Sequence, residues 1–209
     1  FIAASMTMDI SNQNKLSEVY EELKRLNIEI VRPDINECFA DFRTVDGKFY
    51  YALGGIKAVG FEAISNVVKE RTENGSFKSI NDFLNRVNPK DMNKLQLEGL
   101  VKAGAFDSIN NNRQSLFNSI PNFILKTKNM FENKSANQID LFSEDETTQD
   151  SIVNEIEDWK FEERLSKEFE AVGFFISDHP LNQFTEIFDD YKIVDYTNFN
   201  LSDEIREAN

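Results

Sequence analysis

A short run of small residues, Gly54–Gly60, contains the residue types that bind anions in proteins. It directly precedes a segment, 61–73, whose apolar residues recur with the period of an α-helix. Gly60 would therefore stand at a helix N-terminus, where free amide N–H groups and the positive end of the helix dipole favour phosphate. We expect a phosphate-contacting turn made of Gly55, Lys57, Ala58, Val59 and Gly60, with the Lys57 ammonium group as an added charge.

A second turn of small residues lies between two further predicted helices, 90–102 and 113–128. It consists of Lys102, Ala103, Gly104 and Ala105. Helix, small-residue turn and helix thus occur twice, as in a tandem helix-hairpin-helix region, which holds the sugar-phosphate backbone without reading the bases. The alternative is that both turns are ordinary corners of a helical core, in a purely structural module.

Catalytic chemistry has little support in this sequence. Nucleotidyl transfer by two metal ions needs clustered carboxylates on rigid strands. The acidic runs Glu144–Glu146 and Asp189-Asp190 lie instead in a polar stretch and after a predicted helix. We expect no catalytic residue, no metal site and no cofactor. A rival enzyme class is a helix-hairpin-helix repair glycosylase with Asp82 as its catalytic residue, although Ser79 and Asp82 also fit a capping box that begins a helix.

The single cysteine and the single histidine narrow the functional classes further. Cys38 has no partner for a disulfide, which favours a reducing, cytoplasmic setting, and His179 alone cannot build a histidine metal cluster. No apolar run reaches membrane-spanning length, so no membrane partner is expected. The sequence begins at Phe1 without a signal-peptide pattern, and we expect it to be a piece of a longer protein.

An apolar island, Gln138–Phe142, interrupts a polar stretch at 129–156 that we interpret as an exposed linker. Burying Leu141 and Phe142 on a partner would contribute about 3–6 kcal/mol, less the cost of ordering the peptide. The result is a weak contact, on the order of micromolar. The island is either such a docking peptide, with Gln138 and Asp140 as its polar residues, or a loop that folds back on its own domain.

The remaining elements predict a mainly α fold with a short β-hairpin. A helix is expected at 15–26, with Asn14 as its N-cap. Asp46-Gly47 between two apolar runs predicts the hairpin. The apolar run Val172–Ile176 indicates a strand, and 181–188 a last helix with an apolar inner face.

The charge of the chain is unevenly distributed. A net charge of −14 argues against a broad electrostatic surface for nucleic acid. Residues 51–137, however, carry 12 Lys/Arg and 8 Asp/Glu, whereas residues 138–209 carry 5 and 20. This division indicates two surfaces with different partners.

Several stretches of the chain, in this order, resemble the C family of bacterial replicative DNA polymerases, the DNA polymerase III alpha subunits. They are Phe1–Ala4, Arg32–Asn36, Ala52–Gly60, Leu100–Asp107, Gln138–Phe142 and Gly173–Leu181. Residue 58 is alanine where many relatives have glycine, and only one proline, Pro33, occurs where the family usually has two. The end of the chain, 189–209, matches poorly.

The resemblance implies four parts: the end of the fingers domain at 1–53, a tandem helix-hairpin-helix DNA-binding region at 54–128, an exposed linker at 129–156, and a helical segment at 157–209 that leads toward an oligonucleotide-binding (OB) domain absent from this sequence. Gln138, Asp140, Leu141 and Phe142 match the pentapeptide that binds the sliding clamp. The implied partners are primer-template duplex DNA, the sliding clamp and other replicase subunits. The intact polymerase would use Mg²⁺, whereas the family's catalytic carboxylates lie before Phe1.

Overall fold

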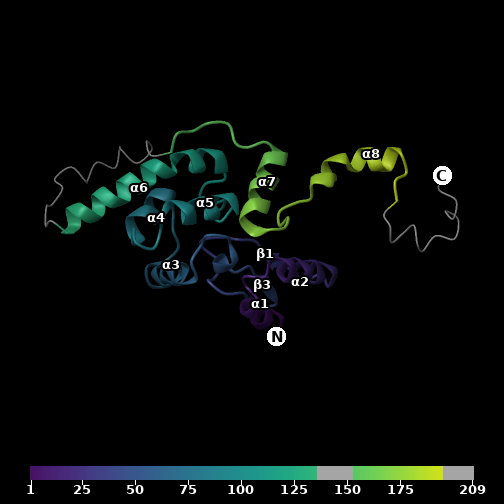
Figure 1. The fold of residues 1–209 in the computed structure, drawn as a ribbon, viewed down its shortest axis with the longest axis horizontal. Helices are drawn as coiled ribbons and strands as arrows, with labels where there is room; N and C mark the ends of the chain where they lie inside the picture. Colours follow the sequence, from purple (N-terminus) through teal and green to yellow (C-terminus); the bar gives the residue numbers. More distant parts are fainter. Residues whose placement is uncertain (136–152, 195–209) are drawn as a thin grey trace. The chain divides into compact units, whose positions relative to one another are not determined.

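The computed structural model describes residues 1–135 and 153–194, which fall into one compact unit at Phe1–Ser177 and a second that begins at Asp178 (Figure 1). The described residues are mostly helical and include one small three-stranded sheet, so the predicted fold class is confirmed. Among these residues, no helix has both the length and the apolar character needed to cross a membrane.

Two helices begin the first unit, α1 (Ile2–Met8) and α2 (Gln13–Arg25). Asn12 caps α2, because its side-chain oxygen accepts a hydrogen bond from the Lys15 amide at 3.2 Å. The predicted N-cap, Asn14, was therefore wrong by two residues. The apolar stripe faces the core as expected, and its buried members are Leu16, Tyr20 and Leu23.

The sheet contains β1 (Ile30–Val31), β2 (Arg43–Val45) and β3 (Lys48–Tyr50), in the order β1-β3-β2. Strands β2 and β3 form the predicted hairpin, in which Asp46 and Gly47 have φ values of 49° and 80°. Positive φ at both central residues matches the right-handed twist of the strands. Strand β1 adds to β3 in parallel, and β3 leads into the 3₁₀-helix η1 (Leu53–Gly55).

Four helices follow: α3 (Phe61–Asn74), α4 (Ile80–Arg86), α5 (Lys94–Lys102) and α6 (Arg113–Ser135). Helix α6 lies along α4 and α5 (Figure 1). The rings of Phe77, Phe83 and Phe106 stack edge to face at centroid distances of 5.1 and 5.0 Å and form part of the core beneath these helices. The linker predicted to start at residue 129 was wrong at this end, because α6 continues to Ser135.

Helix α7 (Phe161–Val172) packs against α5 and completes the first unit. The strand predicted at 172–176 does not form, because α7 includes Val172 and ends at Gly173, whose φ is 94°. Phe174 and Ile176 are nevertheless buried. The Glu168 carboxylate accepts the amides of Ile176 and Ser177 at 2.8 and 2.7 Å, so a side chain replaces the strand partner.

The described part of the second unit consists of η3 (Pro180–Phe184) and α8 (Thr185–Asp190). The helix predicted at 181–188 is thus divided between a 3₁₀-helix and an α-helix. Its expected inner face is largely exposed: Leu181, Phe184 and Ile187 are 51%, 40% and 49% accessible. No core forms beneath these side chains within the described residues.

Candidate nucleic-acid interface

The first predicted turn, 55–60, begins at the last residue of η1, ends at the N-cap of α3 and is partly open to solvent. Gly55 and Val59 are buried, whereas Lys57, Ala58 and Gly60 are exposed. The buried residues hold the turn on the core, and the exposed ones form its outer edge. The structure therefore exposes Lys57, Ala58 and Gly60 directly before the N-terminus of α3 and leaves the other two predicted residues in the core.

Two neighbouring helices fix this turn. The Lys57 amide donates to the Ala171 carbonyl of α7 at 2.8 Å. On the other side, α5 approaches so closely at Gly99 that a Cβ there would lie 2.8 Å from the Lys57 carbonyl oxygen. Only glycine permits this approach. The turn is thus a rigid part of the unit, held by residues far apart in the sequence.

The N-terminus of α3 is available to an anion. Gly60 is its N-cap and supplies no capping side chain. The first amides of this 14-residue helix therefore point outward without a capping acceptor, at the positive end of the dipole. The Lys57 ammonium group forms no ion pair with the described side chains of residues 1–131 and 153–194. Glu62, in the first turn of α3, offsets part of this positive charge.

Ala58 adopts φ = 64°, in the left-handed region. This conformation costs an L-residue about 1–2 kcal/mol, and glycine avoids the cost. This is the residue at which many members of the family named in the sequence analysis have glycine. Alanine at this position therefore strains the backbone of the turn. Because Ala58 is exposed, its Cβ does not cover the surrounding surface.

The second predicted turn follows the C-terminus of α5 and is closed. Its amides are already used, because Gly104 N–H donates to the Val101 carbonyl at 3.0 Å and Ala105 N–H to Leu100 at 2.9 Å. This is a Schellman motif, with Gly104 at φ = 78°. Ala103, Gly104 and Ala105 are buried, and Lys102 pairs with Glu170 at 2.9 Å. The geometry therefore favours the first turn over the second as a phosphate site.

A buried arginine fills the second turn. The Arg113 guanidinium contacts Asp107 at 2.6 Å, the Lys102 carbonyl at 3.1 Å and Glu168 at 3.5 Å. Burial alone would lower the pKa of Arg113, but the Asp107 and Glu168 carboxylates outweigh burial and raise it. Its charge is therefore matched by two carboxylates within the protein.

The Arg113–Glu168 pair was missed at the level of the sequence, although Glu168 carries a detectable signal. It lies three residues after Leu165 and four before Val172, on the apolar stripe of α7. A charged residue on such a stripe needs a buried partner.

Asp82, the catalytic residue of the rival glycosylase hypothesis, has a structural role. The Asp82 carboxylate accepts the Lys78 amide at 2.9 Å and pairs with Arg86 at 3.2 Å, which gives it a structural role at the start of α4. The part of the chain that the structure describes contains no group of three or more residues able to hold a metal ion. Gln138, Asp140, Leu141 and Phe142 lie outside the described residues.

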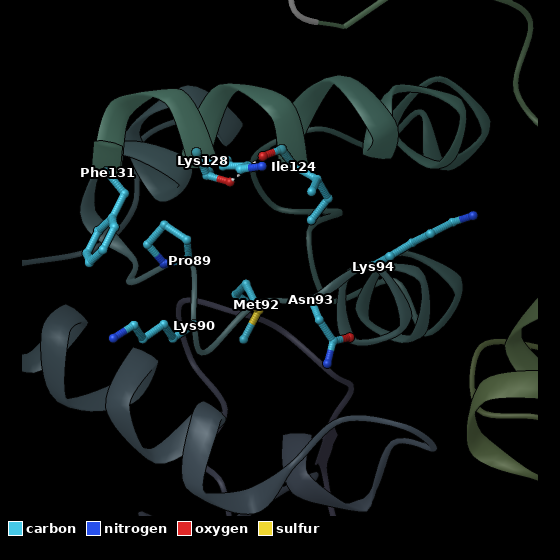
Figure 2. A pocket seen from close by; sticks show the side chains of 9 residues that line it. Pro89, Lys90, Met92, Asn93, Lys94, Ile124, Lys128 and Phe131 are labelled. Atoms are coloured by element: carbon cyan, nitrogen blue, oxygen red, sulfur yellow. Dashed lines mark hydrogen bonds between the residues drawn. The ribbon is translucent and has the colours of Figure 1, made fainter. Parts of the chain in front are cut away.

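An apolar cavity of about 340 Å³ opens between α6 and the turn that precedes α5. Figure 2 shows Met92 and Ile124 turned toward this space, with Phe131 at one side, whereas the Lys94 side chain points away from it. The Lys90 ammonium lies 5.7 Å from the centre of the Phe131 ring. The last turns of α6 therefore have tertiary contacts that the sequence pattern did not indicate.

Comparison with known proteins gives one family match and a set of relatives. The family described as "Helix-hairpin-helix motif" matches residues 27–116. DNA polymerase III subunit alpha of Caulobacter vibrioides is 37% identical over 181 residues, 87% of this chain and 16% of that protein. The same subunit of Borreliella burgdorferi is 36% identical over 195 residues, 91% of this chain and 17% of the relative. The chain thus spans about a sixth of the length of these relatives.

Proposed function

Because the chain is homologous to one segment of bacterial DNA polymerase III alpha subunits, we propose that residues 54–128 hold duplex DNA for such a polymerase. The observation that carries the proposal is the uncapped N-terminus of α3 at Gly60, beside the exposed Lys57. Main-chain amides that contact phosphate ignore base identity, as a replicative enzyme requires. A few such contacts also explain how a chain of charge −14 binds DNA through one small region.

Template-directed synthesis belongs in this proposal to the whole subunit. The described residues do not fit a Mg²⁺ site, since they contain no cluster of metal-ligating side chains. We assign no step of nucleotidyl transfer to them. The role of this segment is to keep the duplex in place by phosphate contacts, as one part of a replicase with further subunits as its partners.

Replacing Gly60 with aspartate is expected to weaken duplex binding at least tenfold and to leave the fold intact. A Cβ at this position meets only ordinary contacts, the nearest being Gln96 Nε2 at 3.5 Å. An N-cap aspartate accepts the first amides of a helix, and relative to glycine it adds only about a few tenths of a kcal/mol of stability. It would therefore occupy the donors that phosphate needs. Fluorescence anisotropy with two duplexes of unrelated sequence measures the loss, which should be equal for both.

Thr72→Asp is the matched control, because it adds the same charge in the exposed last turn of α3. At 1.5 Å per residue it lies about 18 Å from Gly60, beyond the screening length of about 10 Å at 0.1 M salt. The wild-type log–log salt slope is expected to be about −2 to −4. Equal affinity of Gly60→Asp and Thr72→Asp, or a loss confined to one DNA sequence, would refute the proposal.

We also propose that Gln138, Asp140, Leu141 and Phe142 bind the sliding clamp. The support is the match of these residues to the clamp-binding pentapeptide, together with the homology of the chain to alpha subunits. A weak peptide contact suffices for this role, because tethering raises the effective concentration of the polymerase at the primer end.

The double variant Leu141→Ala/Phe142→Ala is expected to abolish the binding of this chain to a bacterial sliding clamp. The wild type should bind with a dissociation constant on the order of micromolar, since two buried apolar side chains supply most of the contact. Surface plasmon resonance with immobilised clamp measures both proteins. Gly60→Asp serves as the control that should retain full clamp binding. Equal binding by wild type and double variant would place the contact elsewhere.

A further inference from the structure

The side chain of Gln96, on α5, is held in one orientation by a capping box. Its Oε1 accepts the Asn93 amide at 2.8 Å, and Asn93 Oδ1 accepts the Gln96 amide at 3.0 Å. A backbone N–H can only donate, so the atom that faces Asn93 N must be the amide oxygen. The NH₂ group of Gln96 consequently points to the opposite side.

That opposite side is the N-terminus of α3. Gln96 Nε2 lies 3.5 Å from the position that a Cβ on Gly60 would occupy. In most helices an N-cap side chain extends from this position and accepts the first amides. Here Gly60 leaves the position without a side chain, and the Gln96 NH₂ group of α5 lies next to it.

Gln96 is also buried and incompletely bonded. Only 7% of the residue is exposed, yet Nε2 is not one of the fully buried side-chain atoms without a partner, and it forms no hydrogen bond with the described side chains and backbone of residues 1–131 and 153–194. Such a donor can bind a ligand, and it forms a stronger hydrogen bond with a charged acceptor than with a neutral one. An anion at the end of α3 would provide that acceptor.

We infer that Gln96 Nε2 and the first amides of α3 bind the same phosphate group of the duplex backbone. This assignment rests on the proposed DNA-holding function and adds to it a donor from α5. The capping box then has two effects, since it begins α5 and also aims a neutral N–H donor at the phosphate bound by α3. Gly99 supports the arrangement, because it permits the close approach of α5 to the turn.

Gln96→Glu tests the inference with little risk to the fold. Glutamate preserves the capping box, because one carboxylate oxygen still accepts the Asn93 amide. Its second oxygen replaces the Nε2 donor with a negative charge that repels phosphate. Duplex affinity is expected to fall at least tenfold, with a free energy of unfolding equal to or above that of the wild type.

Leu95→Glu is the matched control on the same helix turn. Leu95 is 61% exposed, so this variant changes the net charge equally without a group at Gly60. It is expected to lose no more than about threefold in affinity. Equal affinities for Gln96→Glu and Leu95→Glu would overturn the inference.

The Gly60→Asp variant separates failure of this inference from failure of the proposed function. If Gly60→Asp loses DNA binding while Gln96→Glu matches its control, DNA is held at α3 without Gln96. If Gly60→Asp binds as the wild type does, the phosphate site at α3 is refuted, and the assignment of Gln96 is refuted with it.

Discussion

Replacing Gly104 with alanine is expected to lower the free energy of unfolding by about 3 kcal/mol or more. The residue has φ = 78°, which costs alanine about 1–2 kcal/mol. A Cβ there would also lie 2.5 Å from Cζ of the buried Arg113 side chain. The guanidinium would have to move away from Asp107 and Glu168 to relieve this overlap, which would leave buried charges poorly paired. Urea denaturation followed by circular dichroism measures the change.

Gly47→Ala isolates the contribution of the arginine. Gly47 has a similar φ of 80°, and a Cβ there would have no neighbour within 4 Å. This control should lose only the backbone term, about 1–2 kcal/mol. If Gly104→Ala costs no more than Gly47→Ala, the packing of Arg113 against the second turn does not restrain residue 104, and the account of that turn given above is wrong.

The second large effect is expected for Glu168→Ala, which should destabilise the chain by about 3–5 kcal/mol. Glu168 is 1% exposed and accepts the amides of Ile176 and Ser177 in addition to its pairing with Arg113. Truncation removes all three interactions at once. The unbonded amides and the weakened arginine pairing each add a desolvation cost. Denaturant unfolding measures the loss, and Glu168→Gln should recover part of it by still accepting the amides.

A double-mutant cycle identifies the share that belongs to the ion pair. Arg113→Met and Glu168→Met are close in volume to the residues they replace, and together they remove both charges. Residues in one network should be non-additive, so the double variant is expected to lose less than the sum of the singles by about 1–3 kcal/mol. Simple additivity would mean that Glu168 acts only as a backbone acceptor.

Much of the fold could be predicted from local signals. Asp46-Gly47 fixed the hairpin because few other residue pairs adopt its positive φ values. The strand at 172–176 could not be judged in this way, since its amides are accepted by Glu168 from α7. The end of α6 was misjudged for a related reason. The apolar stripe fades after Lys128, while the contacts around Phe131 come from a turn about 40 residues earlier.

In the candidate site, too, residues with a local sequence signal were predicted, whereas contacts between distant residues were missed. Lys57 and Gly60 were predicted because they belong to a run of small residues that directly precedes a helical stripe. The amides of the second turn are used in local hydrogen bonds at the end of α5. The Arg113 side chain that covers this turn is paired with Glu168, 55 residues away, and the two residues meet only in the folded chain. Gln96 was missed because its place in a capping box is a sufficient reason for a glutamine there. Only the folded structure shows that its NH₂ group lies next to Gly60.

The hydrogen bond from the Lys57 amide to the Ala171 carbonyl joins residues that are separated by most of the first unit. Because such a contact closes a long loop, we expect it to form late in folding. The first predicted turn is therefore expected to reach its final form only after α7 has docked. A helix-hairpin-helix region cut at residue 128 would lack this bond, and we expect its first turn to be held less rigidly than in the longer chain.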